Sequence, residues 1–262
     1  MNYLTTNKAT HPVVTIAVPS LNQGPFLNNA LESIFNQDLP VEVYVMDGGS
    51  TDCSVDIIRN WEPRLSGWRS GPDLGQAAAI NEGIALGSAP YVCWLNSDDR
   101  FLPGALKQLC KELERTPLVP GVYGKAWNEF YPSGQLTSVW VESFSASRLA
   151  RRCIVSQPAS LIRRSAWEKV GGLDKKLHMA MDYDLWWRIF KQAGPLSFVN
   201  EYIAVNLIHH RTKTNTRRRL HYQEAMKVVR MHYGSLPLKW WLYMPYSVWY
   251  KSLVNKLNLL VQ

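Results

Sequence analysis

One strand that ends in two adjacent carboxylates constrains this chain more than any other feature. Residues 91–99 read YVCWLNSDD, an apolar run followed directly by Asp98 and Asp99. Two acidic side chains at the end of a buried strand are costly unless a cation neutralises them, and hard divalent cations prefer oxygen ligands of this kind. The sequence therefore predicts a divalent metal at this strand end, with a phosphate-bearing ligand bound to it.

Strands and helices alternate along the first half of the chain. Apolar runs predict buried strands at 13–19, 41–47 and 91–96, and a further strand contains Trp68. Residues with helical spacing predict helices around 27–35, at 76–86 and at 103–115. This order is typical of a parallel sheet with crossover helices, in which ligands bind at the carboxyl ends of the strands.

Polar segments stand at three of these strand ends. Pro19 and Ser20 end the first strand, Asp47 ends the second, and 96–99 follow the third. Because the carboxyl ends of parallel strands share one edge of a sheet, the three segments are expected to meet in one crevice. After Trp127 the alternation weakens, which indicates a second half of mixed strands and short helices.

Composition narrows the class of protein. The chain has 262 residues with 46% hydrophobic content, enough for one large α/β domain or one domain with an appendage. The four cysteines are scattered, which suits a reducing compartment, and no apolar run reaches the roughly 18 residues of a membrane span. We therefore expect a cytoplasmic protein.

The net charge of +8 includes arginine clusters at 148–164 and 211–219, which either bind phosphates or form a solvated face.

Several ordered motifs together resemble a known family. They are VPSLNQGPFLNNALESIFNQ, MDGGSTD, DLGQAAAINEGI, LNSDD, VGGLD and MDYDLWWR. In this order and spacing they resemble the family-two inverting glycosyltransferases of the bacterial surface-polysaccharide type, over roughly residues 12–235. The resemblance implies an α/β GT-A fold whose Rossmann-like, nucleotide-binding half has a mostly parallel, mixed central sheet, followed by a C-terminal helical tail.

The same resemblance implies an organisation and an activity. Residues 1–235 are expected to form one catalytic domain, with a nucleotide-sugar half at about 12–126 and an acceptor and catalytic-base half at 127–235. The implied reaction is the metal-dependent, inverting transfer of a sugar from a nucleotide-sugar donor, with UDP-sugar favoured. The implied acceptor is a saccharide or a lipid-linked saccharide, in the biosynthesis of surface polysaccharide or lipopolysaccharide.

Donor-binding residues follow from the motifs. Gly48 and Gly49 permit a tight turn after Asp47, and the resemblance implies that this carboxylate accepts the imide N–H of a uracil or thymine ring. Asp73 either caps the following helix or, by resemblance, faces the nucleotide and donor sugar. The donor set implied by the resemblance is Pro19, Ser20, Asn22, Asp47, Asp73, Gln76, Asn96 and Asp98.

The metal site is expected at Asp98, Asp99 and His209. The two acids resemble the family's DxD element, although Asn96 stands where an acid is common, so Asn96 is expected to contact the donor sugar or ribose. HHRTKT resembles the family's H-x-x-S-K-T segment, which favours His209 over His210 as a third metal ligand or a diphosphate contact. The implied cofactor is Mn²⁺ or Mg²⁺, both of which prefer hard oxygen ligands.

Inversion requires a base on the side opposite the leaving group. Asp182 is the candidate, because the apolar Met179 and Met181 precede it and a sheltered surface raises the pKa of a carboxylate toward the working range. Asp184 is the competitor and is expected to cap or orient the aromatic helix that follows. By resemblance, Gln157 and Arg163 border the acceptor cleft, and Trp186 either stacks on a sugar ring or belongs to the core.

Residues 236–262 interleave tryptophan, tyrosine and lysine with leucine, a composition typical of membrane interfaces. This tail is expected either to bind a membrane peripherally or to pack on the protein itself or in a homodimer.

Two rival functions exist for the whole chain. A basic nucleic-acid-binding protein would explain the arginines, but RNP-like, KH and zinc-finger patterns are missing, so no nucleic-acid partner is expected. A sugar nucleotidylyltransferase would need a glycine-rich triphosphate loop near the N-terminus, which the sequence lacks.

Overall fold

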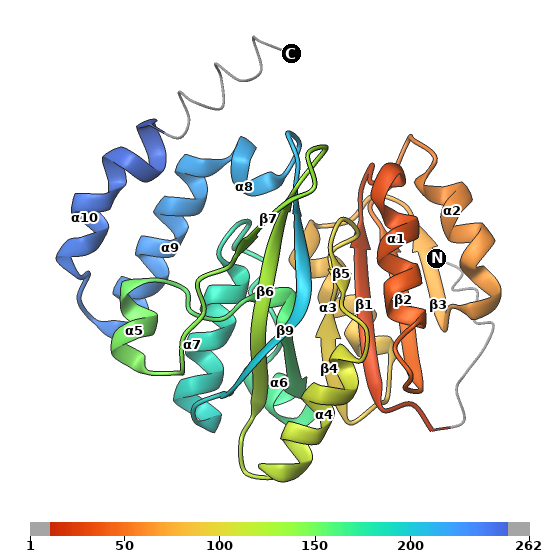
Figure 1. The fold of residues 1–262 in the computed structure, drawn as a ribbon, viewed down its shortest axis with the longest axis horizontal. Helices are drawn as coiled ribbons and strands as arrows, with labels where there is room; N and C mark the ends of the chain where they lie inside the picture. The colour runs from red at the N-terminus through yellow and green to blue at the C-terminus, as the bar shows by residue number, and fades with distance from the viewer. Residues whose placement is uncertain (1–10, 251–262) are drawn as a thin grey trace.

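The computed structural model describes residues 11–250 and shows a mixed β-sheet between two layers of helices (Figure 1). In the described part of the chain the strand order is β3-β2-β1-β4-β8-β6-β9-β5, with β7 paired to β6. The strands are β1 (Val14–Ser20), β2 (Val41–Asp47), β3 (Gly67–Ser70), β4 (Tyr91–Trp94), β5 (Arg100–Phe101), β6 (Gly121–Phe130), β7 (Gln135–Ser138), β8 (Ser160–Arg163) and β9 (Ser197–Ile208).

The helices agree closely with the sequence pattern in the first half. The predicted helix at 76–86 is confirmed at its full length, whereas the one predicted at 103–115 begins at Ala105, because Gly104 adopts a left-handed φ of 71°. The helices are α1 (Gly24–Phe35), α2 (Ser54–Trp61), α3 (Gln76–Leu86), α4 (Ala105–Arg115), α5 (Ala146–Arg151), α6 (Arg164–Val170), α7 (Met181–Ala193), α8 (Lys213–Thr216), α9 (Arg218–Tyr233) and α10 (Leu238–Met244). There are also 3₁₀ turns at Glu62–Arg64 and Gln157–Ala159 and a π-helical turn at Pro245–Tyr250.

Strand direction decides which chain segments meet. The strands β1, β2, β3 and β4 are mutually parallel, and β8 is antiparallel to β4. Since β6 is antiparallel to β8 and parallel to β9, both β6 and β9 run in the same direction as β1. The carboxyl ends of β1, β2, β4 and β9 therefore share one edge, the upper edge in Figure 1. The predicted domain boundaries stay a prediction.

The core is divided between the two faces of the sheet. In β1, Val14, Ile16 and Val18 pack toward α1 and α4, whereas Ala17 faces α3 and α7. Burial on both faces is what a central strand of a parallel sheet requires. Trp94 and Trp186 stack in the second layer, with ring centroids 6.2 Å apart.

A buried ion network joins α7 to α9. The Asp184 carboxylate accepts hydrogen bonds from Arg188 Nε at 2.6 Å and from His232 Nε2 at 2.7 Å. Burial alone would raise the pKa of Asp184, but the His232 hydrogen bond and the Arg188 charge outweigh it and lower that pKa. Asp184 thus orients the helix, as the sequence indicated.

We expect Asp184→Asn to lower the free energy of unfolding by about 3 kcal/mol at pH 7, because it leaves a partly buried guanidinium without its counter-charge. A carboxyl with a lowered folded-state pKa stabilises the fold above its unfolded-state pKa, so the difference between wild type and variant should shrink as the pH falls through both values. Urea unfolding of both proteins over a range of pH measures this difference in the free energy of unfolding. The control is Asp38→Asn, whose side chain is 91% exposed. Equal stability of wild type and Asp184→Asn would contradict the network.

Candidate functional site

The loops after β1 and β2 are bonded to each other at the common edge. Ser20 and Asp47 are register partners at the carboxyl ends of their strands. Asn22, in the left-handed region with φ 53°, accepts a hydrogen bond from Thr51 N at 2.9 Å through Oδ1. Its own N–H donates to Ser50 Oγ at 2.7 Å. The convergence predicted for these two segments is therefore present.

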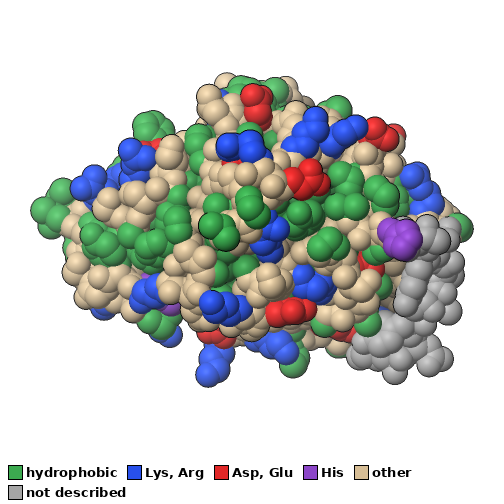
Figure 2. Space-filling view, turned by 90° about the horizontal axis from the view of Figure 1, so that it is seen from below, with side chains coloured by type: hydrophobic (Ala, Val, Ile, Leu, Met, Phe, Trp, Pro, Cys, Tyr) green, Lys and Arg blue, Asp and Glu red, His purple; other side chains and the backbone are tan. Residues whose placement is uncertain are grey.

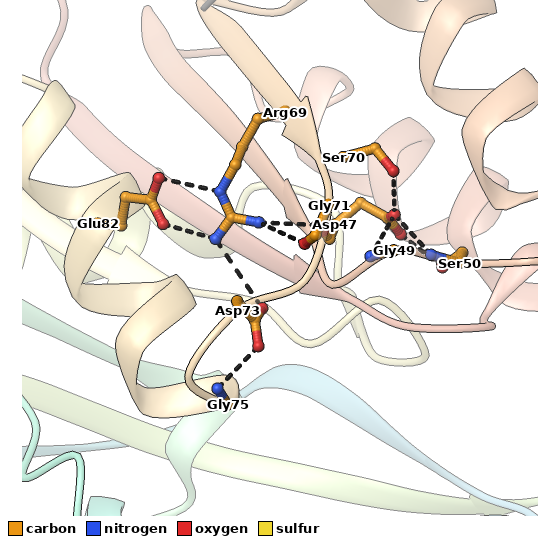
Figure 3. A network of polar contacts seen from close by, with 9 residues as sticks. All are labelled: Asp47, Gly49, Ser50, Arg69, Ser70, Gly71, Asp73, Gly75 and Glu82. Atoms are coloured by element: carbon orange, nitrogen blue, oxygen red, sulfur yellow. Dashed lines mark hydrogen bonds and ion pairs between the residues drawn. The ribbon is translucent and has the colours of Figure 1, made fainter. Parts of the chain in front are cut away.

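Asp47 shapes the loop that follows it (Figure 3). Its carboxylate accepts hydrogen bonds from Gly49 N at 3.0 Å, Ser50 N at 2.8 Å and Ser70 Oγ at 2.7 Å. The Ser50 hydroxyl donates to the other carboxylate oxygen. The side chain is 0% exposed, so a direct contact with a nucleotide base would require it to exchange one of these donors. Sequence reasoning did not find this loop-shaping role.

Arg69 connects the neighbouring segments and was also missed. Its guanidinium forms two hydrogen bonds to the Glu82 carboxylate, at 2.9 and 2.5 Å, and a third to the Asp47 carbonyl at 2.8 Å. The same group lies 3.9 Å from Asp73 Oδ2 (Figure 3). A pairing between residues 13 positions apart on a strand and a helix has no local sequence signal.

Asp73 lies between the start of α3 and the loop after β2. Its Oδ1 accepts a hydrogen bond from Gly75 N at 2.7 Å, which closes the turn before α3, whereas within residues 11–250 the first-turn N–H groups of α3 receive no side-chain cap. Its Oδ2 lies so close to Gly48 that a Cβ at that glycine would come within 3.3 Å of it. Gly48 thus permits a close approach between the two loops, and Asp73 stands at the site as well as at the helix end.

A chain of amides links the middle of the site. Gln76 Nε2 donates to Asn96 Oδ1 at 2.8 Å, and Asn96 Nδ2 donates to Asp99 Oδ2 at 2.9 Å. Gln157 Oε1 lies 3.3 Å from Asn96 Nδ2, which brings one predicted acceptor residue into the same cluster. From the other side, Lys213 Nζ donates to Gln76 Oε1 at 3.0 Å.

The two acids differ in their surroundings. Asp98 Oδ2 lies 3.1 Å from His209 Nε2, and two neighbouring ligand atoms of an octahedral Mg²⁺ would lie about 3 Å apart. Asp99 is 6% exposed, and its Oδ1 accepts a hydrogen bond from Leu207 N at 3.1 Å. Burial, and secondly the charge of Asp98, raise the pKa of Asp99 well above its ordinary value. A nearby cation would relieve this repulsion.

The donor set thus fits a hard divalent cation. Within residues 11–250 no three His, Cys, Asp or Glu side chains already converge as a metal-binding group. Asp98 and His209 have suitable spacing, whereas Asp99 would have to turn away from Leu207 or Asn96 to join them. His209 is held by the Phe26 ring, with centroids 4.6 Å apart, and His210 is exposed.

Asp182 stands in the first turn of α7. The apolar shelter predicted for it is present, because Met179 and Met181 are buried. Burial raises the pKa of Asp182, while a hydrogen bond from Tyr183 N, at 2.8 Å, and the charge of His221 oppose that rise. A carboxylate with a raised pKa can accept a proton near neutral pH.

The structure does not bring two of the predicted acceptor residues to the site, and for Trp186 it shows the core alternative. Trp186 is 0% exposed and stacks on Trp94 in the core, so it offers no face to a sugar. Arg163 is the register partner of Tyr91, the first residue of β4, and therefore lies at the opposite edge of the sheet. Its guanidinium donates to the carbonyls of Leu113 at 2.6 Å and Val119 at 2.8 Å.

Comparisons of sequence show the family of the chain. A family model described as glycosyl transferase family 2 matches residues 15–171, more than half of the chain. Hyaluronan synthase from Pasteurella multocida is 27% identical over 214 residues, which cover 79% of this chain and 21% of that protein. The chain spans between about a fifth and a third of the length of the first curated relatives it matches.

Comparison with solved structures shows the fold of this chain. TarS residues 1–349 from S. aureus, in complex with UDP-GlcNAc, has a TM-score of 0.69 at 17% identity, covering 84% of this chain and 66% of that one. The mannosyltransferase PcManGT from Pyrobaculum calidifontis, in complex with GDP-Man and Mn²⁺, has a TM-score of 0.64 at 19% identity, covering 96% and 73%. The predicted α/β GT-A fold is confirmed. The region matched by the family model includes the loops after β1 and β2 and the acids Asp98 and Asp99, and the chain belongs to glycosyl transferase family 2.

Proposed function

We propose that the chain transfers a sugar, with inversion, from a nucleotide-sugar donor to a saccharide or lipid-linked saccharide acceptor during synthesis of a surface polysaccharide or lipopolysaccharide. The observation that carries the proposal is a polar cluster of two hydrogen-bonded groups, His209 with Asp98 and Lys213 with Gln76, Asn96 and Asp99, which meet at the adjacent residues Asp98 and Asp99. It lies at the strand ends, where sheets of this type bind ligands. Relatives named for hyaluronan and chondroitin synthesis support it.

The donor nucleotide is proposed to lie across the loops after β1 and β2. Ser20 Oγ is buried and, within the described residues, lacks a hydrogen-bond partner, so a small movement of the loop would let it bond to a ligand. Pro19 and Asn22 flank it, Asp47 fixes the loop that carries Gly49 and Ser50, and Asp73 lies over Gly48. UDP is favoured as the nucleotide because TarS was solved with UDP-GlcNAc, and PcManGT with GDP-Man makes GDP the alternative.

Asp98 and His209, joined by Asp99 after a side-chain rotation, are proposed to hold Mn²⁺ or Mg²⁺. PcManGT was solved with Mn²⁺, which supports this choice. When bound, such an ion stabilises negative charge on a departing diphosphate. Lys213 adds a positive charge beside Gln76, and burial and the Arg217 charge lower its pKa.

Asp182 is proposed to act as the base. It removes the proton from an acceptor hydroxyl, whose oxygen forms a bond to the anomeric carbon while the bond from that carbon to the diphosphate breaks. The nucleoside diphosphate leaves, and one displacement inverts the configuration. Gln157 is proposed to contact the acceptor, since its amide reaches Asn96 at the centre of the cluster.

A donor panel tests the reaction. UDP-, TDP- and GDP-sugars are incubated with Mn²⁺ and a set of saccharide acceptors, nucleoside diphosphate release is measured, and NMR gives the anomeric configuration of the product. We expect one nucleotide class to be consumed, with inverted product. A retained configuration, or release that is equal in Asp98→Ala, would contradict the proposal.

The described part of the tail packs on the protein chiefly through Trp240, and Val248 is buried as well. Trp240 is buried, and its Nε1 donates to the Ala150 carbonyl at 2.8 Å. On its other side α10 leaves Trp241 50% and Leu242 73% exposed. No helix within residues 11–250 has the length and apolar character needed to cross a bilayer. Residues 251–262 of the predicted tail lie outside the described residues.

We propose that this exposed face binds an anionic membrane surface. Lys239 on α10 and Arg151 on α5, the helix that Trp240 contacts, are exposed, and a combination of basic and aromatic side chains is typical of interfacial helices. Figure 2 views the molecule from the lower edge of the sheet, opposite the strand ends that carry the site, and hydrophobic side chains with Lys and Arg beside them are visible there toward the end that carries α5 and α10. Binding through α10 would place the protein at the bilayer surface that carries a lipid-linked acceptor.

Flotation with vesicles containing anionic lipid tests this surface. We expect the full chain to float, and the double variant Trp241→Ser, Leu242→Ser to remain in the soluble fraction. Leu118→Ser is the control, because Leu118 is 94% exposed and lies outside this surface. Identical distribution of wild type and double variant would end the membrane proposal. A concentration-dependent dimer that the double variant dissociates would instead assign the face to a homodimer.

A further inference from the structure

A carboxylate from α9 caps the start of α7. Glu224 is buried, and its carboxylate accepts hydrogen bonds from His178 N at 3.1 Å, Met179 N at 2.8 Å and Ala180 N at 3.0 Å. Ala180 is the N-cap residue of α7 and offers no side-chain cap of its own. The first N–H groups of a helix need acceptors, and negative charge at this end is favourable. Glu224 supplies the negative charge from a different helix, together with an acceptor for the Ala180 N–H and for the two N–H groups that precede it.

The segment bonded to Glu224 leads directly into the turn that carries the proposed base. Asp182 lies two positions after Ala180, so the hydrogen bonds to Glu224 fix the backbone from which its carboxylate extends. His221 stands one turn before Glu224 on α9 and interacts with Asp182. Helix α9 therefore contacts the surroundings of Asp182 through a carboxylate at the backbone and an imidazole near the side chain.

The same helix follows directly on the segment that reaches the donor side of the site. Lys213, in α8, donates to Gln76 and also interacts with the Glu224 carboxylate. The polar cluster at the strand ends and the cap on α7 are thus joined through one short stretch of chain. Loss of Glu224 would remove an anchor between them without removing any group from the donor site.

We propose that Glu224 is a positioning residue for the transfer reaction, holding the first turn of α7 so that the Asp182 carboxylate faces the acceptor hydroxyl. This inference rests on the proposed function, because it takes Asp182 as the base. Glu224 itself faces the backbone N–H groups of 178–180 and touches no reacting atom. A displacement of the base by 1 Å is enough to cost about 100-fold in rate.

The test compares Glu224→Gln and Glu224→Ala with the wild type. Glutamine keeps the size and one acceptor oxygen, whereas alanine removes the cap. We expect kcat to fall about fivefold in the first and about 100-fold in the second, while the Kd of the nucleoside diphosphate stays within about twofold. Glu114→Gln is the matched control, because Glu114 is an exposed glutamate on α4. Thermal unfolding of each variant checks that the fold is retained.

The pH profile separates positioning from general stability. Burial lowers the pKa of His221, and the charge of Arg218 lowers it further. The charges of Asp182 and Glu224 oppose this and raise the pKa of His221. Cys153 also interacts with Asp182. Without the Glu224 charge His221 is protonated less, and Asp182 loses stabilisation of its charged form. The acidic limb of the kcat profile should therefore move to higher pH in Glu224→Gln.

Each outcome is decisive. Wild-type kcat and an unmoved pH profile in Glu224→Gln would overturn the positioning role. A parallel loss of nucleotide affinity, kcat and thermal stability would also overturn it, in favour of a purely structural cap. If Asp182→Asn retains activity, the base assignment in the proposed function has failed, and that result is distinct from a failure at Glu224.

Discussion

Asp182→Asn is expected to lower kcat by about 10²- to 10⁴-fold, because the amide cannot accept a proton from the acceptor hydroxyl. Nucleotide Kd should stay within about twofold, since Asp182 stands on α7 and not in the loops proposed to hold the donor. Steady-state kinetics and calorimetry on the same preparation measure both quantities.

The pH dependence of the wild type adds a second readout. Burial raises the pKa of Asp182, and the base works only when it is deprotonated. The rate should therefore fall on the acidic side at a pH above the ordinary range of an aspartate. Asp174→Asn, which changes an exposed aspartate in the turn before α7, is the control. Activity of Asp182→Asn within tenfold of wild type would remove Asp182 from the mechanism.

Asp98→Ala and His209→Ala are each expected to weaken Mn²⁺-dependent binding of a nucleoside diphosphate at least about 100-fold, because even outer-shell partners of a metal site contribute 10- to 100-fold in affinity. The reason is geometric, since the two side chains already have the separation of adjacent metal ligands. Calorimetric titration with and without Mn²⁺ measures the metal-dependent part of the affinity.

The neighbouring histidine provides the control. His210 is exposed, whereas His209 is buried against Phe26, so His210→Ala should bind nucleotide and Mn²⁺ as the wild type does. Loss of metal-dependent binding in His210→Ala, with none in His209→Ala, would show that the choice between them is wrong. Retained binding in both histidine variants and in Asp98→Ala would place the metal elsewhere.

The local sequence pattern was sufficient to predict the strands and helices that position the site. The continuous apolar runs place β1 and β2, and the alanine-rich periodicity places α3, because each signal depends on neighbours within one strand or helix. The meeting of Ser20, Asp47 and Asp98 at one edge follows from parallel strand order alone.

Side-chain direction and long-range pairing were beyond the sequence pattern. Trp186 and Asp182 share one helix, and only the packing on Trp94 shows that the tryptophan is core. Arg163 belongs to an arginine pair, yet its bonds to distant carbonyls place it at the far edge. Glu224 caps a helix that begins more than 40 residues earlier, and no local spacing encodes such a contact.

The most direct test of a nucleotide-sugar site at these strand ends is calorimetric titration of UDP, TDP and GDP into the full chain, with and without Mn²⁺. The proposed site predicts that one nucleotide, UDP first, binds tightly only with the metal, and that Asp98→Ala abolishes this difference. Failure of all three nucleotides to bind, or equal binding without Mn²⁺, would contradict the proposed metal-dependent donor site.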